Sequence, residues 1–164
     1  MRSVRLALAA ALLVVPPAQA KGPVVGEPAP AYQLTTIDGV KISSDELKGQ
    51  VVVLNYWATW CGPCKRELPT LDSYYERMRS HGLRVFAVTT EDSLPNYQLK
   101  KLFAVMHITP VRRIKGPYDI MGGVPTNYVI GRDGRVRYAK AAAFELDDLN
   151  RVLVPLLNEP MPTG

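Results

Sequence analysis

The sequence predicts one α/β domain, with helices on both faces of a central sheet. Residues 51–57 and 83–90 are nearly continuous apolar runs, which are typical of strands buried on both faces. Each run is followed by a stretch of helical character, and the chain closes with a turn, a strand and an amphipathic stretch. With 164 residues, 47% of them apolar, the chain is long enough for one hydrophobic core.

Residues 1–20 differ from the rest of the chain. Two arginines are followed by ten unbroken apolar residues, two prolines and an Ala-Gln-Ala sequence. This pattern predicts a secretory signal peptide cleaved after Ala20, which leaves a soluble, extracytoplasmic domain over residues 21–164. An uncleaved membrane anchor remains the alternative, although ten apolar residues are short against the roughly 20 that span a bilayer. We expect no integral membrane domain after residue 20.

The N-terminal part of the domain predicts a hairpin. Residues 21–30 are rich in glycine and proline and indicate an extended entry. Residues 32–36 and 40–42 flank an Asp-Gly pair, which is a strong turn signal between two strands. Residues 43–47 then predict a short helix capped by Ser43 or Ser44. The domain is therefore expected to carry an N-terminal β-hairpin extension.

The remaining elements follow in order. Residues 65–81 predict a helix ended by Gly82, and residues 95–106 a second helix before an extended piece over 108–114. Further on, the sequence predicts a strand at 124–130 that is entered through a proline, a turn at 131–134 and a strand at 135–140. Four leucines mark one face of a final helix, namely Leu146, Leu149, Leu153 and Leu156.

The charge is mildly basic. The full chain carries a formal charge of +5, and two of its twenty basic residues lie within residues 1–20. A balance this mild does not indicate a nucleic-acid partner. The local basic clusters at 100–101, 112–115 and 132–140 are interpreted as solvated surface.

The chain has only two cysteines, Cys61 and Cys64. Their disulfide would close too short a loop to restrain much of the unfolded chain, so a structural bridge is a weak interpretation. A structural zinc site needs about four ligands, and His81 and His107 lack the spacing to complete one. We therefore predict a redox pair with no metal and no cofactor.

The position of the pair between a buried strand and a helix suits thiol chemistry. Cys61 lies at the predicted helix start, where unpaired N–H groups and the helix dipole should lower its pKa from about 8.5 toward neutrality. Pro63 fits the first turn because its missing N–H costs nothing there. Cys61 would attack a partner disulfide, and Cys64 would then attack Cys61 and release the reduced partner.

The stretch from Asn55 to Pro69 resembles the active-site segment of the exported TlpA/ResA/DsbE family of thioredoxin-fold proteins. Three other segments match that family in order, at residues 26–34, 124–126 and 130–134. The resemblance spans most of the domain. It implies a thioredoxin fold with a central mixed sheet flanked by helices.

The resemblance also implies roles for individual residues. Pro125 would be a cis proline beside the cysteines, and Val124 would present backbone groups to a bound peptide. Trp57 and Trp60 would flank the site, with plain core packing as the alternative for Trp57. The substrate-binding residues are thus expected to be Trp60, Gly62, Pro63, Val124 and Pro125.

Glu67 is the third expected catalytic residue. It lies three residues after Cys64 and so shares a helix face with it. Ordinary thioredoxins carry a buried aspartate where this chain has Asn55, which cannot take a proton. In ResA-like proteins a glutamate at the Glu67 position is proposed for that task. Our hypothesis is that Glu67 helps to deprotonate Cys64, and the alternative is an exposed helix charge.

The dipeptide Gly62-Pro63 is that of thioredoxin, whose potential lies near about −270 mV, and it favours a reductant. The family resemblance implies a transmembrane thiol reductant as electron donor. Its implied substrates are protein disulfides such as apocytochrome c haem-site cysteines or those of a copper-binding oxidase assembly protein. We expect a monomer.

Two other functions stay open. One is a peroxiredoxin-like thiol peroxidase, although Leu54 and Ala58 stand where its Pro-x-x-x-Thr-x-x-Cys pattern needs proline and threonine. The other is a binding module with an idle site, such as a copper carrier or a holdase.

Overall fold

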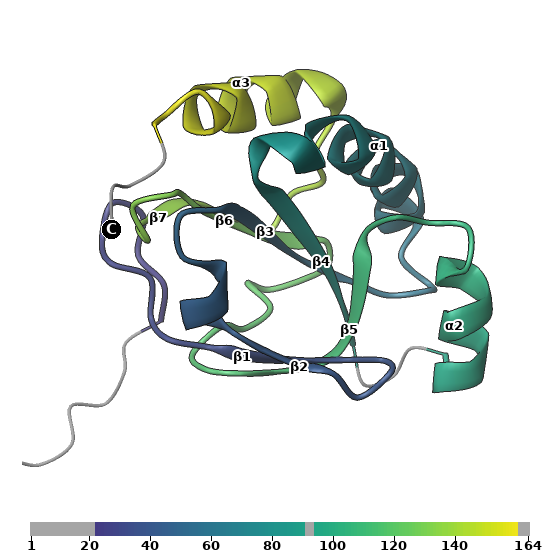
Figure 1. Ribbon diagram of the computed structural model, residues 1–164. Helices are drawn as coiled ribbons and strands as arrows, with labels where there is room; N and C mark the ends of the chain where they lie inside the picture. Colours follow the sequence, from purple (N-terminus) through teal and green to yellow (C-terminus); the bar gives the residue numbers. More distant parts are fainter. Residues whose placement is uncertain (1–21, 91–93, 161–164) are drawn as a thin grey trace, which may run out of the picture.

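The computed structural model describes residues 22–90 and 94–160, so the predicted signal peptide lies outside the described residues. These residues form a seven-stranded mixed sheet in the order β2-β1-β5-β4-β3-β6-β7 (Figure 1). The strands are β1 (Gln33–Thr36), β2 (Lys41–Ser43), β3 (Val51–Trp57), β4 (Leu83–Thr89), β5 (Thr109–Lys115), β6 (Thr126–Ile130) and β7 (Val136–Lys140). The helices are α1 (Gly62–Met78), α2 (Asn96–Phe103) and α3 (Leu146–Leu157), with short 3-10 helices η1 (Ser44–Leu47) and η2 (Arg79–His81).

Strand β3 is an interior strand of the sheet, between β4 and β6. It pairs parallel with β4 and antiparallel with β6, and all seven of its residues are buried. This burial on both faces explains the unbroken apolar run that predicted the strand. Because β3 is held on both sides, the segment that follows Trp57 leaves the sheet from a fixed position at the carboxyl end of this strand.

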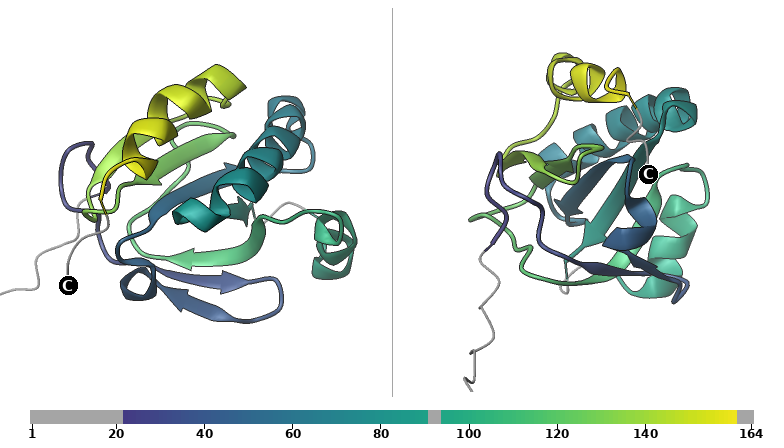
Figure 2. Two further views of the ribbon diagram at one scale, coloured as in Figure 1. Left: turned by 45° about the horizontal axis from the view of Figure 1, so that its top comes forward. Right: turned by 60° about the vertical axis from the view of Figure 1, so that its left-hand side comes forward.

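The helices are distributed differently from the prediction. Residues of α1, α2 and α3 all pack in one core cluster with Val51, Val53 and Trp57 of β3, whereas Val52 and Leu54 face a second cluster. Figures 1 and 2 show α1 and α3 side by side over one face of the sheet. The expectation of helices on both faces is therefore wrong for the α-helices, and η1 is the helix that packs against the opposite face, through Leu47.

The reason lies in the direction of the crossovers. The chain steps from β3 through α1 to β4 and from β4 through α2 to β5, in the same direction across the sheet. Because such crossovers are right-handed, two successive steps in one direction place both helices on one face. A segment over residues 116–125 connects β5 to β6 and contributes Tyr118 to the opposite face.

The predicted N-terminal hairpin is confirmed. Strands β1 and β2 pair antiparallel, and β1 also pairs with β5, so the hairpin extends the sheet at one edge. Ser43 caps η1, and Glu46 Oε1 accepts a 2.8 Å hydrogen bond from the Ser43 backbone N–H. This reciprocal arrangement is a capping box, which satisfies backbone donors at the helix start.

Some predicted boundaries shift. Helix α1 begins at Gly62 rather than at residue 65, and α2 ends at Phe103 rather than at residue 106. Gly82 ends η2 with a φ of 84°, a left-handed conformation that favours glycine, as predicted. In α3, Leu149, Leu153 and Leu156 are buried, but Leu146 is 56% exposed and does not belong to the packed face.

The interpretation of the basic cluster 132–140 as solvated surface is wrong for Arg132. Its side chain is only 6% exposed. The guanidinium donates hydrogen bonds to the backbone carbonyls of Gly49, His81 and Leu157, at 2.9, 2.6 and 3.1 Å. Arg132 therefore joins the entry of β3, the end of η2 and the end of α3, instead of forming part of a solvated surface.

No helix within residues 22–90 and 94–160 is long and apolar enough to cross a membrane.

Candidate active site

The two cysteines lie where β3 gives way to α1, as predicted. Cys61 is the N-cap residue of α1, and the Cys61–Cys64 disulfide is closed, with the two Cα atoms 5.3 Å apart. The backbone N–H of Cys64 donates a 3.1 Å hydrogen bond to Cys61 Sγ. A donor in this position favours a negatively charged sulfur, so the helix start supports a thiolate at Cys61. Cys64 is fully buried.

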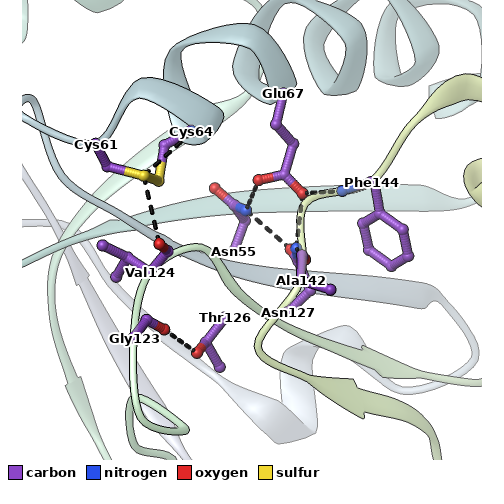
Figure 3. The surroundings of a disulfide bond; sticks show 10 residues. All are labelled: Asn55, Cys61, Cys64, Glu67, Gly123, Val124, Thr126, Asn127, Ala142 and Phe144. Carbon is purple, nitrogen blue, oxygen red and sulfur yellow. Dashed lines mark hydrogen bonds between the residues drawn. A yellow bond between two sulfur atoms is a disulfide. The ribbon is translucent and has the colours of Figure 1, made fainter.

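A cis peptide bond lies opposite the disulfide. The Val124–Pro125 bond is cis, as the family pattern implied. Cys61 Sγ lies 3.5 Å from the carbonyl oxygen of Val124 (Figure 3). Because a disulfide sulfur carries no proton, this contact can become a hydrogen bond only when Cys61 is a thiol. The cis-proline segment and the cysteine pair thus form one site.

Two side chains of β6 hold the segment that precedes the cis proline. Thr126 Oγ1 donates a 2.6 Å hydrogen bond to the Gly123 carbonyl and accepts one of 3.1 Å from the Met121 N–H. Further back, Tyr128 donates a 2.6 Å hydrogen bond to the carbonyl of Asp119. These supports leave no pattern in the sequence, because their partners lie in a connection without regular periodicity.

The surface around the disulfide is partly apolar. Trp60 is 61% exposed, and Gly62 and Pro63 are exposed beside it. Val124 is half-buried. These residues are accessible to a bound polypeptide, as a substrate-binding surface requires.

Trp57 does not share that surface. It is buried, and its ring packs edge-on against Phe103 of α2, with the ring centroids 5.5 Å apart. The core-packing interpretation therefore holds for Trp57. Its contribution to the site is to fix the end of β3, from which the cysteine segment leaves.

Glu67 is the most unusual residue of the site. Its side chain is 1% exposed, so the interpretation as an exposed helix charge is wrong. Glu67 Oε1 accepts hydrogen bonds of 2.7 Å from Asn127 Nδ2 and from the Phe144 backbone N–H, and Oε2 accepts one of 2.9 Å from Asn55 Nδ2 (Figure 3). The carboxyl group is thus surrounded by N–H donors from three separate segments.

Two opposed effects set the pKa of Glu67. Burial raises it by disfavouring the charged form, while the hydrogen bonds from Phe144, Asn127 and Asn55 lower it. Burial is the larger effect, so the pKa lies above the ordinary value of 4.5. A buried carboxyl group with a raised pKa, three residues after Cys64 on the same helix, is suited to exchange a proton with that thiol.

Asn127 and the Phe144 N–H belong to this cluster, although neither was predicted from the sequence. Asn127 lies two residues after the cis proline, and it also donates a 2.9 Å hydrogen bond to the Ala142 carbonyl. The sequence feature that could have identified Asn127 is a polar residue within the predicted strand 124–130. In the structure all five residues of β6 are buried. A buried asparagine in a strand needs hydrogen-bond partners, and here they lie across the sheet.

Comparison with known proteins agrees with this geometry. The profile of the AhpC/TSA family matches residues 25–139. ResA, a thiol-disulfide oxidoreductase of Bacillus cereus, is 33% identical over 119 residues, which cover 68% of this chain and 66% of the relative. ResA of Oceanobacillus iheyensis is 33% identical over 140 residues, or 79% of this chain and 71% of the relative. The chain thus spans 66% of the length of the Bacillus cereus relative.

A solved structure shares the fold. The thiol:disulfide interchange protein of Chlorobium tepidum TLS, described as a thioredoxin family protein, superposes with a TM-score of 0.67 and 25% identity. The match covers 86% of this chain and all of that protein.

Fold and site together define a thioredoxin-fold protein whose Cys-Gly-Pro-Cys pair faces a cis proline. The chain belongs to the AhpC/TSA family, and within it to the thioredoxin-like proteins of the TlpA/ResA/DsbE type.

Proposed function

We propose that this protein is an exported thiol:disulfide oxidoreductase that reduces disulfides of partner proteins. The observation that carries the proposal is the placement of Cys61 at the start of α1, in contact with the carbonyl of Val124 before the cis proline. The ResA relatives, named as thiol-disulfide oxidoreductases, support the same chemistry. The pattern of residues 1–20 supports export.

The reaction has two steps. The thiolate of Cys61 attacks one sulfur of the partner disulfide, so that a mixed disulfide forms and the other partner sulfur leaves as a thiolate. Cys64 then loses its proton and attacks Cys61 Sγ, which releases the second partner sulfur and closes the Cys61–Cys64 disulfide. Two electrons pass to the partner, and a donor dithiol on a transmembrane reductant restores the pair.

Glu67 is proposed to receive the proton that Cys64 loses in the second step. Its burial and raised pKa support that role, as does its position one helical turn after Cys64. Trp60, Gly62, Pro63, Val124 and Pro125 are proposed to bind the partner polypeptide. Trp60, Gly62 and Pro63 are exposed and Val124 is half-buried, with its carbonyl against Cys61 Sγ, whereas Pro125, which follows Val124 in the sequence, is buried.

The dipeptide between the cysteines supports this direction of electron flow. Gly62-Pro63 favours a potential near thioredoxin's value of about −270 mV and therefore a reductant, although the dipeptide alone does not fix the potential. Suitable substrates are the haem-site cysteines of an apocytochrome c or the cysteines of a copper-site assembly protein. A measured potential near about −120 mV, as in a strong oxidant, would reverse the assignment.

Turnover of insulin disulfides with dithiothreitol tests the central claim. Cys61→Ser should abolish the reductase activity, whereas Cys64→Ser should trap the mixed disulfide as a covalent adduct. Full activity of Cys61→Ser would overturn the proposal. Parallel assays with peroxide and with copper separate a thiol peroxidase and a metal-binding module from a reductase.

A second experiment tests the role of Glu67. Glu67→Gln should slow resolution of the mixed disulfide by roughly 10²-fold and shift the pH at which Cys64 forms its thiolate. Glu76→Gln, an exposed glutamate on the same helix, serves as the control. Unchanged turnover and an unchanged titration of Cys64 in Glu67→Gln would end the assignment.

A further inference from the structure

Asn55 holds a polar atom that the oxidised site does not use. The side chain lies on β3 and is fully buried. Its Nδ2 donates to Glu67 Oε2 at 2.9 Å and to Asn127 Oδ1 at 2.8 Å, which uses both of its N–H groups. Its Oδ1, in contrast, is buried and has no hydrogen-bond partner among the described residues.

The orientation of this amide is fixed by its neighbours. Turning it over would place Asn55 Oδ1 against Glu67 Oε2 and Asn127 Oδ1, so that acceptor would face acceptor. Oδ1 therefore has to point away from the carboxylate. Figure 3 shows it on the side of the amide that faces the disulfide, between Glu67 and the two cysteines.

An acceptor buried without a donor is costly, and such atoms in native proteins call for an explanation. The oxidised pair cannot supply the donor, because neither sulfur of the disulfide carries a proton. Reduction changes this. A donor dithiol delivers two electrons and two protons, the S–S bond breaks, and Cys64 acquires an S–H group in the same buried region.

We propose that Asn55 Oδ1 accepts the S–H hydrogen bond of reduced Cys64, which makes Asn55 a positioning residue between Cys64 and Glu67. The inference rests on the proposed redox function of the cysteine pair. The hydrogen bond exists only with the thiol form, so it keeps Cys64 protonated while Cys61 attacks the partner. Asn55 itself does not accept the proton of Cys64. It positions the Cys64 thiol toward the Glu67 carboxyl group, which accepts that proton.

Infrared spectroscopy can test this without any turnover. Because the chain has only two cysteines, Cys61→Ser leaves Cys64 as its single S–H group. We expect the S–H stretching band of Cys61→Ser to lie at the lowered frequency of a hydrogen-bonded thiol. Adding Asn55→Ala should move the band to higher frequency.

Asn127→Ala provides the matched control. Asn127 donates to the same carboxyl group but satisfies its own Oδ1 with Asn55 Nδ2, so it offers Cys64 no acceptor. The band should stay in place in Cys61→Ser/Asn127→Ala. An unmoved band in the Asn55 variant, or an equal shift in both, would overturn the proposal.

Should Asn55→Ala fail to fold, the structure of the reduced wild-type protein decides. Cys64 Sγ within hydrogen-bonding distance of Asn55 Oδ1 supports the proposal, and a water between them, with the sulfur out of reach, contradicts it. The proposed function fails separately. If Cys61→Ser retained reductase activity, the redox role of the pair would be rejected, but the assignment of the S–H band would stand. If the protein were a normal reductase and Asn55→Ala did not shift the band, only the role of Asn55 would be rejected.

Discussion

The backbone N–H of Phe144 donates a 2.7 Å hydrogen bond to Glu67 Oε1, across 77 residues of sequence. This bond ties α1, which carries the cysteines, to the segment that leads into α3. Asn55 of β3 and Asn127 of β6 donate hydrogen bonds to the same carboxyl group. Glu67 therefore connects α1 to two strands of the sheet and to the segment before α3. Glu67 is therefore expected to affect folding stability as well as proton transfer.

Glu67→Ala should lower the free energy of unfolding by roughly 3 kcal/mol. The substitution leaves three buried N–H donors, those of Asn55, Asn127 and Phe144, without their acceptor, and such losses are costly. Urea denaturation of the oxidised protein measures the change. Glu76→Ala, on an exposed face of the same helix, should stay within about 0.5 kcal/mol of wild type. Equal midpoints for the two variants would contradict the prediction.

The same carboxyl group should make stability depend on pH. Burial raises the pKa of Glu67 above 4.5, so the folded protein keeps a proton that the unfolded chain has already released. Its contribution is fully present below the unfolded pKa and is lost as pH rises through the higher folded pKa. The free energy of unfolding of wild type relative to Glu67→Gln should therefore fall from about pH 4.5 upward and then level off.

Because glutamine does not titrate, the difference between the two curves isolates Glu67. Denaturation series at closely spaced pH values supply both curves. A difference that stays constant, or that rises with pH in this window, would show that the hydrogen bonds outweigh burial in setting the pKa.

Arg132→Met should be destabilising by roughly 3 kcal/mol. Methionine retains much of the apolar stem, but it leaves the carbonyls of Gly49, His81 and Leu157 without their shared donor. Thermal or urea unfolding measures the loss. Arg112→Met removes an exposed cation from β5 and is the matched control, with an expected change within about 0.5 kcal/mol. Similar losses in both variants would mean that the buried contacts of Arg132 contribute little.

These residues also show what the sequence could and could not predict. The strand Val51–Trp57 and the helix end at Gly82 were predictable, because burial on both faces and a left-handed turn each leave a local pattern. Arg132 was interpreted as part of a solvated surface, and the helix spacing that linked Glu67 to Cys64 did not reveal its burial, since the groups that bury both residues lie far away in sequence. The partners of Glu67 are 12, 60 and 77 residues distant, a relationship that spacing along the chain does not encode.

Placement of the α-helices on one face was missed for a related reason. Alternation of strands and helices predicts that crossovers exist, but the face they cover depends on strand order. That order places β4 and β5 successively on the same side of β3. It is fixed by which strands pair, and the hairpin β1–β2 occupies the edge beyond β5.

Thr126→Val should weaken the binding of protein substrates while sparing the reactivity of Cys61. Valine has nearly the shape of threonine, but it removes the hydrogen bonds that join Oγ1 to the Gly123 carbonyl and the Met121 N–H. The segment before the cis proline then loses a support worth about 1–2 kcal/mol, close to a tenfold change in affinity. We expect KM for insulin to rise about tenfold, and the rate with a small aromatic disulfide to stay unchanged.

Thr70→Val, which removes only an exposed hydrogen bond to the Arg66 carbonyl in α1, controls for the loss of a threonine hydroxyl. If both substrates slowed equally, Thr126 would act on the cysteine pair and not on the surface that binds the partner.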